Sequence, residues 1–212
     1  RGGAYKPRTS PYEFQGLGEE GLKLLSKARE ETGLPIVTEL LSQDHAELVA
    51  DYADMLQIGT RNAQNFQLII AAAKTGKPVL LKRGMSMRIM EWLLAGEYVL
   101  ANQNSNLLFC ERGVRTFEDY TRNTLDLSAV AVVKNESHCP IVVDPSQGCG
   151  KASLVKAMCK GAVAMGADAL IVEVHPDPTH AISDAAQQID LEGFNELMKE
   201  LVPIAESVGR EM

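Results

Sequence analysis

Short apolar runs alternate with longer amphipathic stretches along almost the whole chain. The longer stretches repeat their apolar positions every three to four residues, which predicts helices at 18–32, 44–53, 65–75, 87–103, 151–165 and 191–208. The short runs are rich in β-branched residues, which predicts strands at 35–40, 55–59, 78–83, 106–112, 140–144 and 169–175. A longer irregular connection is expected around 127–134.

This regular alternation of strand and helix is typical of an α/β protein with a parallel sheet. An open doubly wound sheet and a closed (β/α)8 TIM barrel both fit the pattern. The chain has no G-x-G-x-x-G opening a helix, and nearly every predicted strand ends in charged, polar or glycine residues. Barrel enzymes build their sites from several strand ends in this way. We therefore predict a (β/α)8 barrel, with residues 1–212 forming a single domain.

The opening segment, RGGAYKPRTSPYEFQG at 1–16, is interpreted as the end of a further strand. Counting it brings the predicted strands to seven, whereas a closed barrel has eight. The chain starts within this segment and without Met. The simplest expectation is that the first strand precedes Arg1, so that the chain carries strands two to eight of the barrel.

Composition and charge narrow the possible functions. The chain is 45% hydrophobic with only 5% aromatic residues, which suits the Leu, Ile, Val and Ala core of an α/β protein. A formal charge of −7 argues against a nucleic-acid binder. No apolar stretch approaches the length of a membrane span, and no signal peptide is recognisable. Four cysteines without metal-finger spacing suggest reduced thiols and a cytoplasmic protein.

Cations gather in the opening segment and at other strand ends despite the negative net charge. The opening segment combines these cations with hydroxyls and glycines, a combination that suits phosphate binding, although a solvated basic terminus is the alternative. So many cations exceed the need of one phosphate, and we expect two phosphorylated substrates or one with two anionic ends. The cations are Arg1, Lys6, Arg8, Arg61, Lys82, Arg83, Arg112 and Arg115.

Carboxylates end or closely follow other predicted strands, namely Glu39, Asp144, Glu173 and, slightly further on, Asp184. In such positions they either bind a divalent cation or transfer protons. Glu111 is interpreted as an ion-pair partner of a neighbouring arginine, and His175 as a residue facing the site.

Seven motifs in this order carry a family resemblance: KPRTSPYEFQG, IGTRNAQNF, PVLLKRGM, CERGVRTFE, VVDPSQ, VEVHPDP and ISDAAQQ. Together they resemble the 3-deoxy-D-arabino-heptulosonate 7-phosphate (DAHP) synthases of type Iβ. The sister family that makes 3-deoxy-octulosonate 8-phosphate shares the barrel but differs from KPRTS in the first motif. The resemblance implies condensation of phosphoenolpyruvate with erythrose 4-phosphate, the first step of the shikimate pathway, in a homo-oligomer (dimer or tetramer).

The resemblance also assigns roles to individual residues. Lys6, Asp144 and Glu173 are implied to be catalytic, with Lys6 as the acid/base at the aldehyde oxygen and Asp144 at the sugar hydroxyls. Phosphoenolpyruvate is implied to bind Arg1, Lys6, Arg61, Lys82, Arg112 and the backbone amide of Thr60. The phosphate of erythrose 4-phosphate is implied to bind Arg8, Thr9 and Ser10.

The metal site is where the sequence departs from the family. The resemblance implies a divalent ion held by a cysteine of the first strand, the histidine of DPSH, and the carboxylates that correspond to Glu173 and Asp184. Gln147 stands at the histidine position. A weakened Mn²⁺, Mg²⁺, Zn²⁺ or Fe²⁺ site using Gln147, Glu173, Asp184 and water is the interpretation we prefer. A metal-independent variant and a rescue by Cys149 remain open.

Two other functions remain open beside the synthase. A non-catalytic or regulatory paralogue would keep the phosphate sites without turnover, and a related synthase would use another phosphosugar aldehyde.

Overall fold

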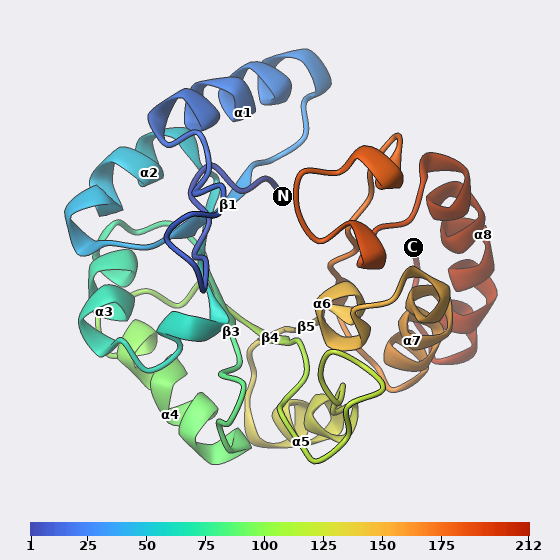
Figure 1. Cartoon of the computed structure of the whole chain (residues 1–212). Coiled ribbons are helices and arrows are strands. Elements are labelled where there is room, and N and C mark those ends of the chain that lie inside the picture. Colours follow the sequence, from blue (N-terminus) through green and yellow to red (C-terminus); the bar gives the residue numbers. More distant parts are fainter. The chain divides into compact units, whose positions relative to one another are not determined.

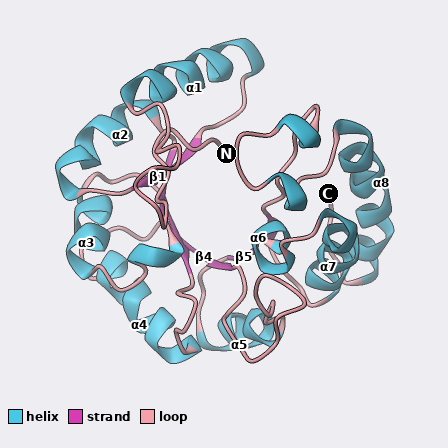
Figure 2. Ribbon diagram, viewed as in Figure 1, coloured by secondary structure: helices cyan, strands magenta, loops and turns pink.

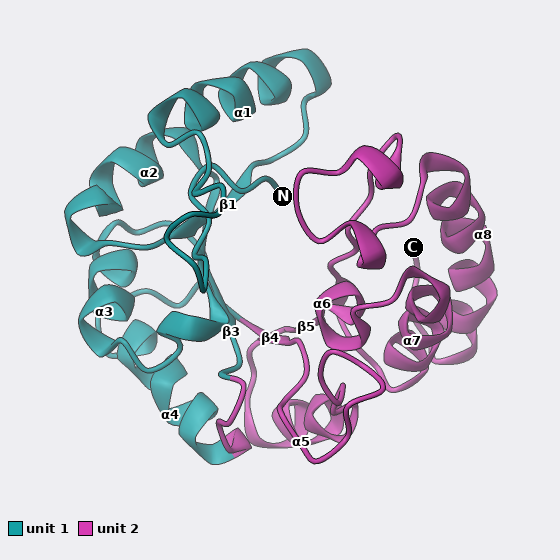
Figure 3. Cartoon of the chain, viewed as in Figure 1, with its two compact units in different colours: residues 1–84, 90–108 teal, residues 85–89, 109–212 magenta.

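The computed structural model describes all 212 residues, which fold into two compact units (Figure 3). Unit 1 comprises residues 1–84 and 90–108, and unit 2 comprises residues 85–89 and 109–212. In both units short parallel strands alternate with helices (Figures 1 and 2), which confirms the α/β class. The prediction of a single domain stays a prediction. None of the helices combines the length and the apolar character needed to cross a bilayer.

Unit 1 contains three consecutive parallel strands and the helices that connect them. Gly33 ends the first helix in the left-handed conformation (φ 72°) that glycine adopts at low cost. The elements are α1 (Glu19–Thr32), β1 (Val37–Leu40), η1 (Gln43–His45), α2 (Ala46–Tyr52), β2 (Met55–Ile58), η2 (Thr60–Asn62), α3 (Phe66–Lys74), β3 (Val79–Lys82) and α4 (Ile89–Leu100), of which Ile89 belongs to unit 2.

The register of these strands places polar side chains next to one another. β1 pairs with β2 so that Glu39 lies opposite Gln57, and β2 pairs with β3 so that Gln57 lies opposite Leu80. All four residues of β3 are buried, including the terminal Lys82. Trp92 of α4 is fully buried and donates its indole N–H to the Leu81 carbonyl at 3.1 Å, which anchors the helix to β3.

Unit 2 continues the alternation after β4 (Leu107–Glu111), whose first two residues belong to unit 1. β4 pairs in parallel with β5, and β5 pairs in parallel with β6. The further elements are α5 (Ser128–Glu136), β5 (Ile141–Val143), α6 (Pro145–Cys149), α7 (Ala152–Ala164), β6 (Ala169–Leu170), η3 (Pro178–His180), η4 (Ala185–Gln187) and α8 (Leu191–Ser207).

The core of unit 2 forms where α7 and α8 pack together (Figure 1). Val155, Cys159, Leu197 and Leu201 are buried there at helical spacing, and the partly buried Val174 packs against them. Since both helices present one apolar face, their packing removes that face from water and holds the segment after β6 in place.

Two local expectations were wrong, and one helix was not predicted. Residues 128–136 form the helix α5 rather than an irregular connection, and their buried Ala129, Val130 and Val133 have helical spacing. The last predicted strand is regular only over Ala169–Leu170, because beyond it the backbone bonds become isolated links such as the bridge between Val174 and Ile189. The short helix α6 was not predicted from the sequence.

The opening segment is not a regular strand either. Gly2 donates one backbone hydrogen bond to the Val37 carbonyl (3.0 Å), so the segment starts beside β1. It then folds back on itself through an isolated antiparallel bridge between Tyr5 and Gly16. Gly16 has φ 97°, and a Cβ there would lie 2.2 Å from the Ala4 carbonyl oxygen, so this reversal requires glycine.

Asp168 joins several parts of unit 2, and we expect its replacement by Asn to destabilise the fold. Its carboxylate accepts hydrogen bonds from the Ile141 backbone (2.8 Å), Lys134 (3.1 Å) and Arg210 (2.6 Å). Partial burial acts to raise the pKa of Asp168, but these bonds outweigh it and lower the pKa below its usual value. Asp168→Asn should lower the free energy of unfolding at pH 7 by about 1–3 kcal/mol, measured by urea denaturation.

Urea denaturation of wild type and Asp168→Asn at lower pH tests whether the ionised Asp168 carboxylate provides the stabilisation. A lowered folded-state pKa means that the stabilisation is complete above the unfolded pKa and is lost as pH falls through the folded value, so the difference between wild type and variant should shrink below about pH 4. Asp51→Asn, at an exposed position of α2, is the matched control. A pH-independent difference would contradict the role of the ionised carboxylate.

Candidate active site

The residues predicted for the site fall into two groups, one in each unit. Unit 1 holds Arg1, Lys6, Arg8, Thr9, Ser10, Thr60, Arg61 and Lys82, and unit 2 holds Arg112, Asp144, Gln147, Glu173 and Asp184.

In unit 1 a hydrogen-bonded chain runs from Arg1 to a buried carboxylate. The Nε of Arg1 donates to Oε1 of Gln57 at 2.7 Å, and Nε2 of Gln57 donates to Oε2 of Glu39 at 3.1 Å. The strand register explains the second contact, since Glu39 and Gln57 are cross-strand neighbours on one face. Glu39 and Gln57 are both buried. Glu39 therefore fixes the Gln57 amide, which in turn fixes the Arg1 guanidinium.

Glu39 is the electrostatic centre of unit 1. Burial raises the pKa of its carboxyl, and the positive charges of Arg1, Lys82, Arg61 and Lys6 act in the opposite direction. These four cations are the unit 1 side chains predicted to bind phosphoenolpyruvate. They therefore act on one small region, and Lys82 is itself buried there.

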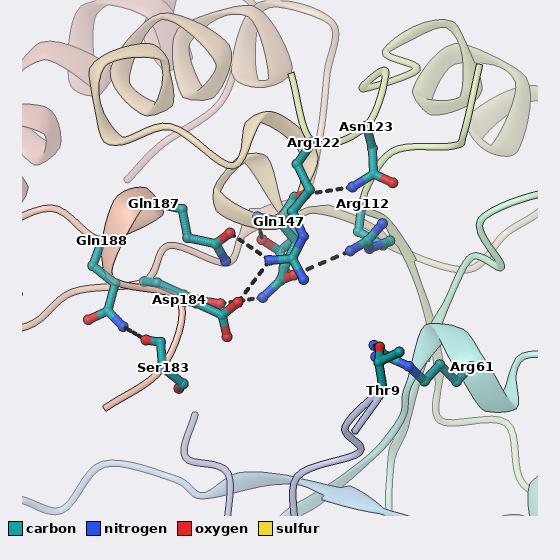
Figure 4. Close-up of polar contacts among 12 residues, drawn as sticks. Thr9, Arg61, Arg112, Arg122, Asn123, Gln147, Ser183, Asp184, Gln187 and Gln188 are labelled. Carbon is teal, nitrogen blue, oxygen red and sulfur yellow. Dashed lines mark hydrogen bonds and ion pairs between the residues drawn. The ribbon is translucent and has the colours of Figure 1, made fainter. Parts of the chain in front are cut away.

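The opening segment contacts the end of β2 through its hydroxyls. Nη2 of Arg61 lies 3.4 Å from Oγ1 of Thr9 (Figure 4), and Thr60 begins the short helix η2 that carries Arg61. Arg8 donates from Nε to the Phe14 carbonyl at 3.1 Å.

Ser10 also lies within this fold-back. Its Oγ accepts the Tyr12 N–H at 3.3 Å. The KPRTS segment is therefore held by its own loop and by Arg61 instead of extending as a loose tail.

In unit 2 the sequence D-P-S-Q-G-C-G builds a five-residue helix, α6, at the end of β5. Asp144 is the N-cap and accepts the Gln147 backbone N–H at 3.0 Å. Pro145 occupies the first turn, where no N–H is needed, and Gly150 ends the helix with φ 68°. This cap fixes Asp144, which is fully buried, and places the Gln147 side chain beside Arg112 and Glu173.

The Gln147 amide bridges an arginine and a carboxylate. Nη2 of Arg112 donates to Oε1 of Gln147 at 3.2 Å (Figure 4), and Nε2 of Gln147 donates to Oε1 of Glu173 at 2.6 Å. Burial lowers the pKa of Arg112, and the negative charge of Asp144 acts against this shift.

Asp184 forms a second charged cluster in unit 2. Nη1 of Arg122 lies 2.9 Å from Oδ1 of Asp184 and 2.8 Å from Oε1 of Gln187, so the guanidinium joins the two side chains (Figure 4). Asp184 has φ 54°, a left-handed conformation that costs free energy in a non-glycine residue and that Asp tolerates better than most. The Arg122 contact holds its carboxylate in this strained position.

Comparison with known proteins identifies the family. The DAHP synthetase I family matches residues 1–207. The chain belongs to this family. It is 53% identical over 209 residues to the phospho-2-dehydro-3-deoxyheptonate aldolase of Thermotoga maritima, covering 99% of this chain and 62% of the relative. A 2-dehydro-3-deoxyphosphooctonate aldolase of Syntrophotalea carbinolica is 34% identical over 209 residues, covering 93% of this chain and 74% of the relative.

Solved structures agree with this assignment to the DAHP synthetase I family. The crystal structure of the DAHP synthase of Thermotoga maritima superimposes with a TM-score of 0.96 at 52% identity, covering 99% of this chain and 62% of that one. A truncated form of the enzyme from the same organism gives 0.92 at 48% identity, covering 99% and 76%. The chain thus spans less than two thirds of the length of the Thermotoga relative.

DAHP synthases generally depend on a divalent metal ion, for which Gln147, Glu173 and Asp184 are the candidate ligands in unit 2. They do not fit. Gln147 turns its NH2 group to Glu173 and its oxygen to Arg112, and Asp184 is paired with Arg122. The chain contains no group of three or more His, Cys, Asp or Glu side chains arranged to hold a metal. The preferred interpretation of a weakened metal site at Gln147, Glu173 and Asp184 therefore finds no support in the side-chain geometry.

Several contacts of the candidate site were missed by the sequence reading. The sequence analysis named none of Gln57, Arg122, Asn123 and Gln187 as a candidate site residue. The expectation that Glu111 pairs with a neighbouring arginine overlooked its backbone contacts, because its Oε1 accepts the Gly113 N–H at 2.6 Å. The one signal in the sequence that could have indicated these contacts was a polar residue within an apolar run, such as Gln57, which is buried in the structure.

His175 uses its ring in a local turn. Its Nδ1 accepts the Asp177 N–H at 3.0 Å. The prediction that it faces the site stays a prediction.

Gly59 is required by the Glu39 carboxylate, and its replacement by Ala should be costly. A Cβ at residue 59 would lie 1.8 Å from Oε1 of Glu39. Gly59→Ala should therefore lower the free energy of unfolding by roughly 2 kcal/mol or more, measured by urea denaturation. The control is Gly76→Ala, where φ is 73° but the new methyl meets nothing within 4 Å, so that only backbone strain of about 1 kcal/mol is added. Equal losses in the two variants would argue against the collision with Glu39.

Cys149 and Cys159 should be unreactive in the folded protein. Burial, with a smaller contribution from nearby negative charge, raises the pKa of Cys149 to about 11 and that of Cys159 to about 12. At pH 8 both stay protonated, and the thiolate is the reactive and metal-binding form. Iodoacetamide labelling at pH 8, followed by peptide mass spectrometry, should be at least about tenfold slower than in urea-unfolded protein. Equal rates would contradict the burial of these thiols.

Proposed function

We propose that the complete protein is a DAHP synthase, which condenses phosphoenolpyruvate with erythrose 4-phosphate to give 3-deoxy-D-arabino-heptulosonate 7-phosphate and phosphate. The observation that carries the proposal is the convergence of Arg1, Lys6, Arg61 and Lys82 on the region of the buried Glu39. A cluster of that charge, in which Lys82 is buried and Arg1 is hydrogen-bonded to Gln57, suits a small dianion such as phosphoenolpyruvate. Arg112, with its fixed guanidinium, and the Thr60 backbone are proposed to complete this set.

The aldehyde substrate is proposed to bind the KPRTS segment. Arg8, Thr9 and Ser10 would hold its phosphate, and Asp144 would meet its hydroxyls. The loop that fixes this segment supports the assignment, because a preorganised anion site loses less entropy on binding than a loose tail.

The chemistry proceeds without a redox step. C3 of phosphoenolpyruvate attacks the aldehyde carbon, and Lys6 is proposed to deliver the proton that the aldehyde oxygen takes up. Water then adds at C2, and phosphate leaves by cleavage of the C–O bond, which produces the ketone. Holding both substrates beside each other supplies much of the rate enhancement for such a bimolecular step. Glu173, held by α6, remains a proposed catalytic residue.

The two kinds of relative make products of different length, which indicates the length of the aldehyde substrate. A three-carbon donor and a four-carbon aldehyde give a heptulosonate, whereas a five-carbon aldehyde gives an octulosonate. The 53% identity to the heptonate enzyme against 34% to the octonate enzyme favours erythrose 4-phosphate.

The fold part of the proposal is a single-domain (β/α)8 barrel. The strand–helix alternation and the TM-score of 0.96 over 99% of this chain support it. A cytoplasmic location is also proposed, on the ground that the four cysteines are buried and unbridged. The homo-oligomer, a dimer or tetramer, stays a prediction.

Activity of the full-length protein tests the proposal. Phosphoenolpyruvate, followed by its ultraviolet absorbance, should disappear only when erythrose 4-phosphate is present, with one phosphate released per molecule consumed. Binding of phosphoenolpyruvate without consumption would favour a non-catalytic paralogue. Faster turnover with a pentose 5-phosphate would favour the related synthase.

Replacement of Lys82, with Lys74 as the matched control, tests the proposed phosphoenolpyruvate site. Lys82→Met removes a buried cation from the proposed phosphoenolpyruvate site and should lower kcat/KM by about 100-fold or more. Lys74→Met, at the exposed end of α3, should leave kcat/KM unchanged. Thermal unfolding of both variants separates a loss of fold from a loss of substrate binding. If the Lys82→Met protein is folded and keeps its activity, Lys82 is not part of the phosphoenolpyruvate site.

A further inference from the structure

The hydrogen bonds of α6 fix the carboxylate that the family resemblance assigns to a metal ion. Ser146 accepts the Glu173 backbone N–H at 2.9 Å, and Gln147 donates to the Glu173 carboxylate at 2.6 Å. Two adjacent residues of one helix therefore hold both the main chain and the side chain of Glu173. The carboxylate is oriented by the protein itself.

The orientation of the Gln147 amide follows from its two neighbours. The Arg112 guanidinium can only donate hydrogen bonds, so the amide oxygen must face it, and the carboxylate of Glu173 accepts from the NH2 group. Turning the amide around would place donor against donor and acceptor against acceptor. In this orientation the amide presents an N–H to Glu173, where a histidine could present a lone pair to a metal.

The second carboxylate, Asp184, is held by an ion pair with Arg122 at 2.9 Å. Arg122 is itself tied to the end of α6, because its backbone N–H bonds to the Cys149 carbonyl at 3.0 Å. The neighbouring Asn123 donates its amide to the Gln147 carbonyl at 3.0 Å. The segment that carries Arg122 and the helix that carries Gln147 are thus one hydrogen-bonded assembly.

Electrostatics in this assembly oppose a divalent cation. The Gln147 side chain bonds directly to the Arg112 guanidinium, and Asp184 bonds directly to that of Arg122. A divalent ion bound by these carboxylates would displace their present partners and lie close to two fixed positive charges. Mn²⁺, Zn²⁺ and similar ions prefer imidazole, thiolate or unpaired carboxylate donors, which these contacts do not offer.

We infer that this site works without a bound divalent metal ion, and that the N–H of Gln147 and the guanidinium of Arg122 hold Glu173 and Asp184 instead. The prediction about metal binding stands independently of the reaction, whereas the prediction about activity rests on the proposed function.

The first experiment measures metal binding by the full-length protein. After dialysis against EDTA and then against metal-free buffer, the protein is given excess Mn²⁺, Zn²⁺ or Mg²⁺, desalted, and analysed by inductively coupled plasma mass spectrometry. We expect well below one ion per chain, and a Tm that shifts by less than about 1 °C with each ion present. Retention of about one ion per chain, or a clear rise in Tm, would overturn the inference.

Activity is measured on the same preparations. Phosphoenolpyruvate consumption should stay within about twofold of its starting value after chelation, and added metal should not raise it further. A loss of more than about tenfold that Mn²⁺ restores would refute the inference. A protein that binds no metal and consumes no phosphoenolpyruvate would refute the proposed synthase while leaving the metal-binding result intact.

Gln147→His tests the residue itself. An imidazole at this position can present a ring lone pair where the amide presents its NH2 group, and it should create affinity for Mn²⁺ or Zn²⁺, seen as retained metal and a metal-dependent rise in Tm. The control is Gln67→His on the exposed face of α3, which should retain none. If wild type and both variants each retain about one ion per chain, Gln147 does not decide metal binding and the inference fails. Wild-type metal content answers the question even if Gln147→His does not fold.

Discussion

Charged side chains at the ends of buried parallel strands need partners, and this requirement shapes much of the molecule. Ionised groups lose hydration on burial, and only hydrogen bonds or opposite charges compensate for the loss. Glu39 shows the result in unit 1, where Gln57 and several cations act on one carboxylate. Glu111 shows it in unit 2, where the Gly113 and Asp126 backbone N–H groups bond to its carboxylate. The same contacts that permit burial also fix the positions of the neighbouring cations.

In unit 2 the short helix α6 is the element that combines these demands. Asp144 caps it, Ser146 holds the Glu173 main chain, and Gln147 connects Arg112 to the Glu173 carboxylate. Five residues therefore contribute a cap, a backbone acceptor and a bridging amide. Because an amide both donates and accepts, Gln147 can join a cation to an anion, a role that fits a structural network better than metal ligation.

Much of the fold was predictable because buried strands and amphipathic helices have different apolar periods. The strands beginning near residues 37, 55, 79, 107 and 141 appear where the sequence predicts them. The prediction of strands failed where contacts with distant segments override the local sequence pattern. The opening segment was expected to be a strand end, but it folds back at Gly16, and the last strand lasts only two residues. The candidate site was recognised as a set of residue types, whereas Gln57 and Arg122 were overlooked because their roles depend on neighbours distant in sequence.

The sequence alone determined the α/β class, the order of most elements, the cationic strand ends and the family resemblance, since all of these depend on local composition, period and motif order. The family resemblance also implies that Gln147 stands where a histidine is usual. Only the tertiary structure decided which side chains Gln147 contacts. Periodicity cannot reveal that Arg112, Gln147 and Glu173 are joined by hydrogen bonds, or that Arg122 meets Asp184. These contacts depend on chain segments tens of residues apart, and their directions arise only when the helices and strands pack.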